Sequence, residues 1–164
     1  MMKKPLRILA ALAALALTAH CAQARSLDTV GQCPLGASMR YASAAPYAGQ
    51  ANALLALPAF AKRHALAAQG EAPWLENLSG RSGRNRLYRE GAHQVIVLTV
   101  CNPADCDGNR VSIGFEPASG AYFGRLYEGR HVRELGGTPE ELAMQPDAVS
   151  HAVTCAQNLD WETK

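Results

Sequence analysis

Two cysteines separated by four residues carry the strongest chemical signal in this sequence. Cys101 and Cys106 flank a segment that reads Asn-Pro-Ala-Asp. Thiol-exchange enzymes usually place their cysteines closer together at the start of a helix, where the thiolate pKa is lowered. No basic residue adjoins either cysteine here. We therefore interpret the pair as a structural disulfide, and we keep a reactive Cys101 or Cys106 in an exported thiol oxidoreductase as an alternative.

The histidines form no catalytic or metal-binding pattern. The sequence contains no Cys-x-x-Cys, His-Glu-x-x-His, Gly-x-Ser-x-Gly or phosphate-binding glycine loop. We interpret each histidine beyond the first 24 residues as a surface residue; these are His64, His93, His131 and His151. The sequence therefore predicts a protein that is not an enzyme and that holds no metal and no cofactor.

The first 24 residues have the features of a secretory signal peptide. A basic start precedes the apolar run Ile8–Ala19, and Ala22-Gln-Ala24 fits the small-x-small pattern of a cleavage site. The sequence predicts cleavage after Ala24 and a periplasmic or secreted protein, since the apolar run is short for a membrane span. Cys21 raises the alternative of a lipoprotein, but its neighbours fit that processing poorly, and we favour the unlipidated form.

Loss of this leader changes the charge of the chain. Residues 1–24 hold three of the 16 basic residues and none of the 14 acidic ones, so the net charge falls from +2 to −1. This balance gives no reason to expect binding to nucleic acid or to an anionic membrane. The remaining 140 residues suit one domain with a single core.

Four cysteines remain after the leader, and an even number in an exported protein indicates disulfides. They are Cys33, Cys101, Cys106 and Cys155, which allow three pairings. We favour Cys101–Cys106 because a short turn already brings these two together. Cys33–Cys155 then follows by elimination, and it would tie the two ends of the mature domain together.

The Cys101–Cys106 segment, from here on the 101–106 loop, lies between two predicted strands. Val95–Val100 is apolar and β-branched, as in a buried strand, and Val111–Phe115 alternates in the manner of a strand with one covered face. Proline and Asp107-Gly108 mark a chain reversal between them. The sequence therefore predicts a protruding hairpin loop that the disulfide fixes.

The rest of the chain predicts a platform for this loop. We expect a loosely structured N-terminal arm over 25–50 and a domain over 51–164. That domain should contain a helix at about Pro58–Gln69, further strands near 87–89, 121–127 and 131–135, and a short helix capped by Thr138. The predicted fold is α+β: a single antiparallel sheet of four to five strands with helices packed on one face.

One basic segment and one aromatic residue remain to be placed. We interpret Gly80–Arg86 as a solvated loop before a strand, with contact to an anion or a partner as the alternative. Trp74 is expected to fill core space where helix meets sheet, with ligand stacking as the alternative.

A rigid loop on a platform without an active site favours a binding function. Fixing the loop in advance lowers the entropy that binding must overcome, and such a loop can enter a concave cleft, including that of a polysaccharide hydrolase. The alternative is that the disulfide only stiffens a hairpin.

The 101–106 loop resembles a loop of the Ivy family, the inhibitors of vertebrate lysozyme. Cys-Asn-Pro-Ala-Asp-Cys is similar to the family's Cys-Lys-Pro-His-Asp-Cys, and Trp74, the strand at Val95–Val100 and Asn109-Arg110 fall as in that family. The resemblance covers about residues 51–135, and it implies that 51–164 is an Ivy-like inhibitor domain in a secreted or periplasmic, often dimeric, protein, so that a homodimer is an expectation.

The resemblance also implies a partner and a set of site residues. In the family, the bridged loop plugs the active-site cleft of c-type lysozyme, its histidine contacts the catalytic carboxylates, and some members restrain lytic transglycosylases. We therefore expect a partner of the lysozyme or lytic transglycosylase type, bound through the inhibitory loop of Cys101, Asn102, Pro103, Ala104, Asp105 and Cys106.

Two positions of this loop depart from the family pattern. Asn102 stands in place of lysine and Ala104 in place of the histidine. A buried hydrogen bond to a charged group is worth about 1.5–3 kcal/mol, so its loss predicts affinity for c-type lysozyme ten- to a hundredfold weaker. The alternative function is an immunity or envelope-interaction protein on an Ivy scaffold that has lost inhibition of c-type lysozyme.

Overall fold

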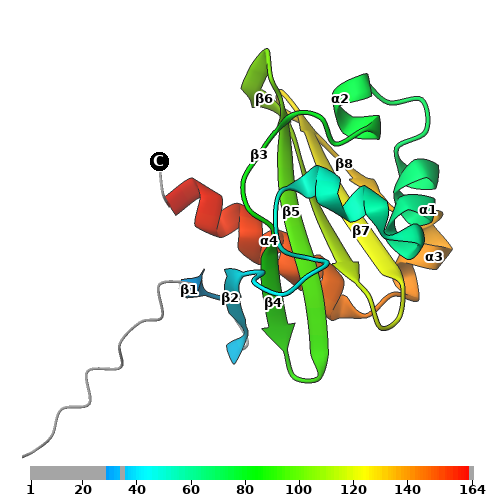
Figure 1. The fold of residues 1–164 in the computed structure, drawn as a ribbon. Coiled ribbons are helices and arrows are strands. Elements are labelled where there is room, and N and C mark those ends of the chain that lie inside the picture. Colours follow the sequence, from blue (N-terminus) through cyan, green and yellow to red (C-terminus); the bar gives the residue numbers. More distant parts are fainter. Residues whose placement is uncertain (1–28, 34–35, 163–164) are drawn as a thin grey trace, which may run out of the picture.

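The fold rests on one antiparallel β-sheet, seen in a computed structural model that describes residues 29–33 and 36–162 (Figure 1). The predicted signal peptide lies outside these described residues. The strands within them are β1 (Thr29–Gln32), β2 (Ser38–Tyr41), β3 (Arg81–Ser82), β4 (Arg86–Glu90), β5 (His93–Asn102), β6 (Asp105–Glu116), β7 (Ala121–Glu128) and β8 (His131–Leu135). The α+β class and the single antiparallel sheet are confirmed, and the sheet is larger than the four to five strands predicted.

The central hairpin of the sheet is formed by its two longest strands. The strands follow the order β1-β2-β4-β5-β6-β7-β8, while the short β3 pairs with the far end of β5. β5 has 10 residues and β6 has 12, and their register runs from Ile96 opposite Phe115 to Asn102 opposite Asp105. The tip of this hairpin projects beyond the rest of the sheet in Figure 1.

The N-terminal arm is more ordered than predicted. Its segment Ser38–Tyr41 pairs with β4 as strand β2, and β1 pairs with β2 in turn. Met39 is fully buried on this strand. The prediction of a loose arm was wrong here because a strand added at a sheet edge depends on the backbone groups that its neighbour offers, which its own composition does not reveal.

Helices cover both faces of the sheet rather than one. Ile96 and Leu98 on β5 join the core beneath the N-terminal helices, whereas Val95 and Val97 join a second core beneath the C-terminal helix. The helical elements are the 3₁₀ helix η2 (Ala51–Ala56), α1 (Pro58–Ala67), α2 (Pro73–Glu76), α3 (Pro139–Ala143) and α4 (Asp147–Glu162). Figure 1 shows η2 and α1 on one side of the strands and α4 across the other. The run Val95–Leu98 of β5 is apolar at every position and therefore needs cover on both faces, and α4 covers the second face.

The two helices that the sequence predicted begin where proline and capping chemistry place them. α1 has Pro58 in its first turn, and α3 has Pro139 there. Thr138 closes a capping box on α3: its hydroxyl accepts from the Glu141 amide at 3.3 Å, and the Glu141 carboxylate accepts from the Thr138 amide at 2.9 Å. Trp74 is half-buried against the core beneath η2 and α1, as expected.

Candidate functional site

The 101–106 loop forms the tip of the β5–β6 hairpin. Asn102 lies opposite Asp105, so the chain reverses through Pro103 and Ala104 alone. The disulfide joins Cys101 to Cys106 across a Cα–Cα distance of 4.8 Å, which confirms the favoured pairing. The register shifts between Cys101, which lies opposite Arg110, and Asn102, which lies opposite Asp105, so residues 106–109 of β6 form an irregularity in the pairing. The tip is thus closed twice, by its turn and by its disulfide.

The polar side chains of this tip bond to the tip itself. The Asn102 side-chain oxygen (Oδ1) accepts from the Ala104 backbone amide at 3.0 Å. The Asp105 carboxylate accepts from the Gly108 amide at 2.9 Å and from the Asn109 side-chain amide at 2.8 Å. Each such bond contributes about 0.5–1.5 kcal/mol, at the lower end when exposed. These side chains therefore hold the shape of the tip.

The Asp105 carboxylate lies directly against Gly108. A Cβ atom built on Gly108 would collide with that carboxylate, so a larger residue would push it off the Gly108 amide. Sequence reasoning treated Asp107-Gly108 as turn residues, but both lie within β6. The spacing of Asp105, Gly108 and Asn109 (i, i+3 and i+4) is the sequence signal that could have indicated these hydrogen bonds.

Neighbouring strands brace the base of the tip. On one side, β3 places Arg81 opposite Cys101, and Gly80 lies so close to the Cys101 carbonyl that a Cβ atom would collide with it. On the other side, the Gly129 amide donates to the Gly108 carbonyl at 2.6 Å. Only the segment beyond these contacts projects freely from the sheet.

The tip exposes a small surface of mixed apolar and acidic character. Pro103, Ala104, Asp105, Cys106 and Asp107 are exposed, whereas Cys101 is 6% exposed and belongs to the base. Behind the tip, the Arg110 guanidinium lies 5.0 Å from the centre of the Tyr127 ring. Such an arrangement can fill a cleft, and it supplies no nucleophile or acid–base pair.

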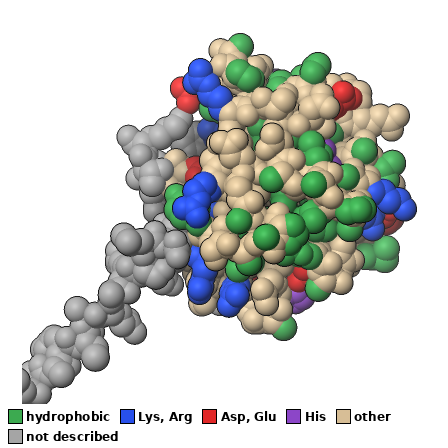
Figure 2. Space-filling view, in the orientation of Figure 1, with side chains coloured by type: hydrophobic (Ala, Val, Ile, Leu, Met, Phe, Trp, Pro, Cys, Tyr) green, Lys and Arg blue, Asp and Glu red, His purple; other side chains and the backbone are tan. Residues whose placement is uncertain are grey.

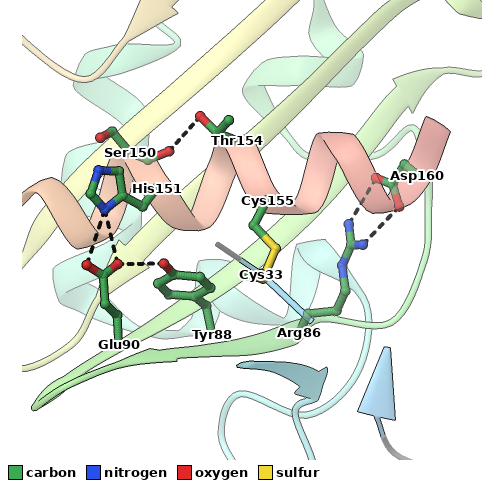
Figure 3. Close-up of a disulfide and its surroundings, with 9 residues drawn as sticks. All are labelled: Cys33, Arg86, Tyr88, Glu90, Ser150, His151, Thr154, Cys155 and Asp160. Carbon is green, nitrogen blue, oxygen red and sulfur yellow. Dashed lines mark hydrogen bonds and ion pairs between the residues drawn. A yellow bond between two sulfur atoms is a disulfide. The ribbon is translucent and has the colours of Figure 1, made fainter. Parts of the chain in front are cut away.

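The second disulfide lies far from this tip and joins the N-terminal arm to α4. Cys33 is bonded to Cys155 with a Cα–Cα distance of 5.6 Å, as elimination predicted. Figure 3 shows two polar clusters around it. On one side the Tyr88 hydroxyl donates to Glu90, which also contacts His151 at 3.1 Å, and these bonds hold the pKa of the Glu90 carboxyl below its usual value.

The other cluster around this disulfide explains part of the basic segment. The Arg86 guanidinium is buried and donates to both Asp160 oxygens on α4, at 2.9 and 3.0 Å, and to the Thr99 hydroxyl at 3.0 Å. The interpretation of Gly80–Arg86 as a wholly solvated loop is therefore wrong at Arg86, which joins the sheet to α4.

His64 corrects the expectation that every histidine lies at the surface. It is 1% exposed. Its Nε2 donates to the Leu75 carbonyl at 3.0 Å, so its Nδ1 accepts from the Tyr122 hydroxyl at 2.9 Å. Burial lowers the pKa of this imidazole and keeps it neutral. Because both ring nitrogens are used, His64 has a structural role.

No group of three or more His, Cys, Asp or Glu side chains within residues 29–33 and 36–162 is arranged to hold a metal ion. In the same part of the chain, no helix is long and apolar enough to cross a membrane. No protein-family model matches the sequence, and no curated protein matches it at a significant level.

Proposed function

We propose that this protein is an exported inhibitor that blocks the active-site cleft of a lysozyme or another peptidoglycan-cleaving enzyme with its 101–106 loop. The observation that carries the proposal is the construction of the hairpin tip. Its disulfide, its turn and the inward bonds of Asn102 and Asp105 fix one shape before any partner arrives. The resemblance of this loop to the Ivy loop supplies the class of partner.

The geometry favours insertion into a concave site over docking on a flat surface. The chain reverses within the two exposed residues Pro103 and Ala104, so the end of the tip is narrow, and it stands beyond the braced base at Gly80 and Gly129. A preorganised loop loses little conformational entropy on entering a cleft, so even a small contact can yield measurable affinity. Its inhibitory effect would come from excluding the glycan chain.

A second candidate function follows from what the tip lacks. Ala104 is exposed at the point where the family has its histidine, and the Asn102 side chain bonds to the Ala104 amide. The tip therefore presents no cation to the carboxylates of a c-type lysozyme. This favours, as the second candidate, an immunity or envelope-interaction protein whose partner lies outside the c-type enzymes.

The test is inhibition of peptidoglycan cleavage by the purified, oxidised protein. We would follow the clearing of a peptidoglycan suspension by a c-type lysozyme and, separately, by a lytic transglycosylase. Inhibition of either enzyme that is lost in Cys101→Ala/Cys106→Ala supports the first function. Lys62→Ala, an exposed change on α1, is the matched control and should leave inhibition unchanged.

Two results would count against inhibition through the loop. One is the absence of inhibition of both enzymes at micromolar protein, which would favour the second candidate. The other is inhibition of equal strength by the wild type and by Cys101→Ala/Cys106→Ala, which would place the contact elsewhere on the molecule.

A further inference from the structure

A groove of about 450 Å³ opens on the sheet face that also carries η2 and α1, at the end of β5 remote from the 101–106 loop. Its walls are residues 42–47 and 116–118, and its floor is formed by β4 and β5. Gln94 on this floor is eight residues from Asn102 along β5, which corresponds to about 26 Å at 3.3 Å per residue. The anion groove, as we call it below, is therefore separate from the hairpin tip.

Two arginines line the anion groove from adjacent strands. Arg40 on β2 lies opposite Leu87, and Arg89 lies two residues further along β4, so both arginines project from one face of the sheet. Diagonal neighbours of this kind are about 7–8 Å apart. Figure 2 shows Lys and Arg side chains along the edge of this face that overlies β2 and β4.

Neither arginine is neutralised by a described carboxylate. Arg40 and Arg89 are exposed, and neither forms an ion pair within the part of the chain that the structure describes. The one acidic residue that lines the anion groove, Glu116, is 4% exposed and bonds to His93 at 2.8 Å and to the Ser119 hydroxyl. Two like charges thus face the groove, and the nearby carboxylate is already engaged.

The interior of the anion groove between these arginines is apolar. Leu87 is half-buried and Ile96 is 2% exposed, and Tyr47 packs against the same core from the wall. A volume of several hundred Å³ with an apolar floor and a few convergent polar groups is typical of sites for small molecules. The two arginines favour an anionic group on the ligand, and the apolar floor favours an apolar group next to it.

We propose that the anion groove binds a small amphipathic anion, with a carboxylate or phosphate group at Arg40 and Arg89 and an apolar body against Leu87 and Ile96. Guanidinium groups bind both kinds of oxyanion through charge-assisted hydrogen bonds. Carboxylate and phosphate share this chemistry, and the experiment below distinguishes them. The site goes beyond the proposed inhibition and does not depend on it.

The test is calorimetric titration of the purified protein with sodium octanoate and with octyl phosphate, beside 1-octanol as the neutral analogue. We expect saturable binding of at least one anion. Octanol should bind at least about tenfold more weakly than that anion, because it cannot form the charge-assisted hydrogen bonds. The anion that binds more tightly identifies the head group. Raising the salt concentration should weaken the binding of the anions and leave the binding of octanol unchanged.

Variants locate the site. Arg40→Gln/Arg89→Gln should weaken anion binding by about tenfold or more, and Lys62→Gln/Arg63→Gln, an equal charge change at two exposed residues of α1, should not. Arg40→Lys/Arg89→Lys keeps the charge and should retain part of the affinity.

The proposal would be overturned if neither anion showed saturable binding to the wild-type protein. It would also be overturned if the wild-type protein bound octanol as tightly as it binds the anions. The octanol comparison uses wild-type protein, so it decides even where a variant fails to fold. Unchanged anion binding in a folded Arg40→Gln/Arg89→Gln protein would also overturn it.

Discussion

The two disulfides should differ in kind, because one closes a long loop through the core and the other closes a short loop at a tip. Two double variants test this difference, Cys33→Ala/Cys155→Ala and Cys101→Ala/Cys106→Ala. The sequence separations are 122 and 5 residues. The chain-entropy relation assigns about 5 kcal/mol to the long closure and about 2 kcal/mol to the short one.

Burial increases this difference. Cys33 is 8% exposed and Cys155 is 3% exposed, so removing their sulfur atoms also leaves unfilled space between β2, β4 and α4. In the other bridge, Cys106 is exposed at the tip, where solvent replaces the lost atoms, and only Cys101, which is 6% exposed, leaves unfilled space. We therefore expect the first double variant to lose about 4–5 kcal/mol or more of unfolding free energy, and the second about 2–3 kcal/mol.

The assay is urea unfolding of the three oxidised proteins, followed by circular dichroism and extrapolated to water. Inhibition of peptidoglycan cleavage is measured on the same samples. We expect Cys101→Ala/Cys106→Ala to remain folded and to lose inhibition. If that variant lost as much unfolding free energy as Cys33→Ala/Cys155→Ala, the assignment of the small bridge to loop geometry would be refuted.

Three further predictions follow from buried groups. The pKa of His64 is lower in the folded protein, so the imidazole takes up a proton more readily in the unfolded chain as the pH falls. The contribution of neutral His64 to stability is therefore present above about pH 6.5 and is lost as the pH falls below that value. The urea midpoint of His64→Gln should fall less than that of the wild type over the same pH range. Gly80→Ala should cost about 1–3 kcal/mol and loosen the 101–106 loop, whereas Gly83→Ala, where an added Cβ meets open space, should be nearly neutral in the same assay. Asp160→Asn should lower the unfolding free energy by about 1–3 kcal/mol, because it removes the charged partner of the buried Arg86 guanidinium; thermal unfolding measures the loss.

Local patterns in the sequence identified the centre of this fold. The alternation in Val111–Phe115 and the apolar run in Val95–Val100 are confirmed as parts of β6 and β5, and Pro58 and Thr138 marked true helix starts. These features are decided within a few residues of the chain, where side-chain period and capping chemistry act.

The elements that were not predicted depend on distant partners. β2 exists because β4 offers it a free edge, and Ser38–Tyr41 alone carries no strong strand pattern. α4 packs mainly small side chains, such as Ala148, Ala152 and Ala156, which give a weak amphipathic signal. The burial of His64 depends on a hydroxyl 58 residues away in Tyr122. None of these is visible in a short window of sequence.

The candidate site divides in the same way. Its disulfide and its turn could be predicted from Cys101, Pro103 and Cys106, because short-range geometry sets them. The inward bonds of Asn102 and Asp105 could not, since an exposed polar residue in a loop is equally consistent with contact to a partner. Within the predicted loop, the side chains of Asn102 and Asp105 thus hold the shape of the tip itself.

The central claim is that the hairpin tip enters the cleft and lies against the catalytic carboxylates of a glycan-cleaving enzyme. The most direct measurement is the inhibition constant of Ala104→His against a c-type lysozyme, compared with the wild type. Ala104 is exposed at the tip, so the change adds an imidazole without disturbing the core. We expect inhibition ten- to a hundredfold stronger, which corresponds to about 1.5–3 kcal/mol, because the imidazole adds a charged hydrogen bond. An unchanged inhibition constant, or no inhibition by either protein, would contradict insertion of the tip into that cleft.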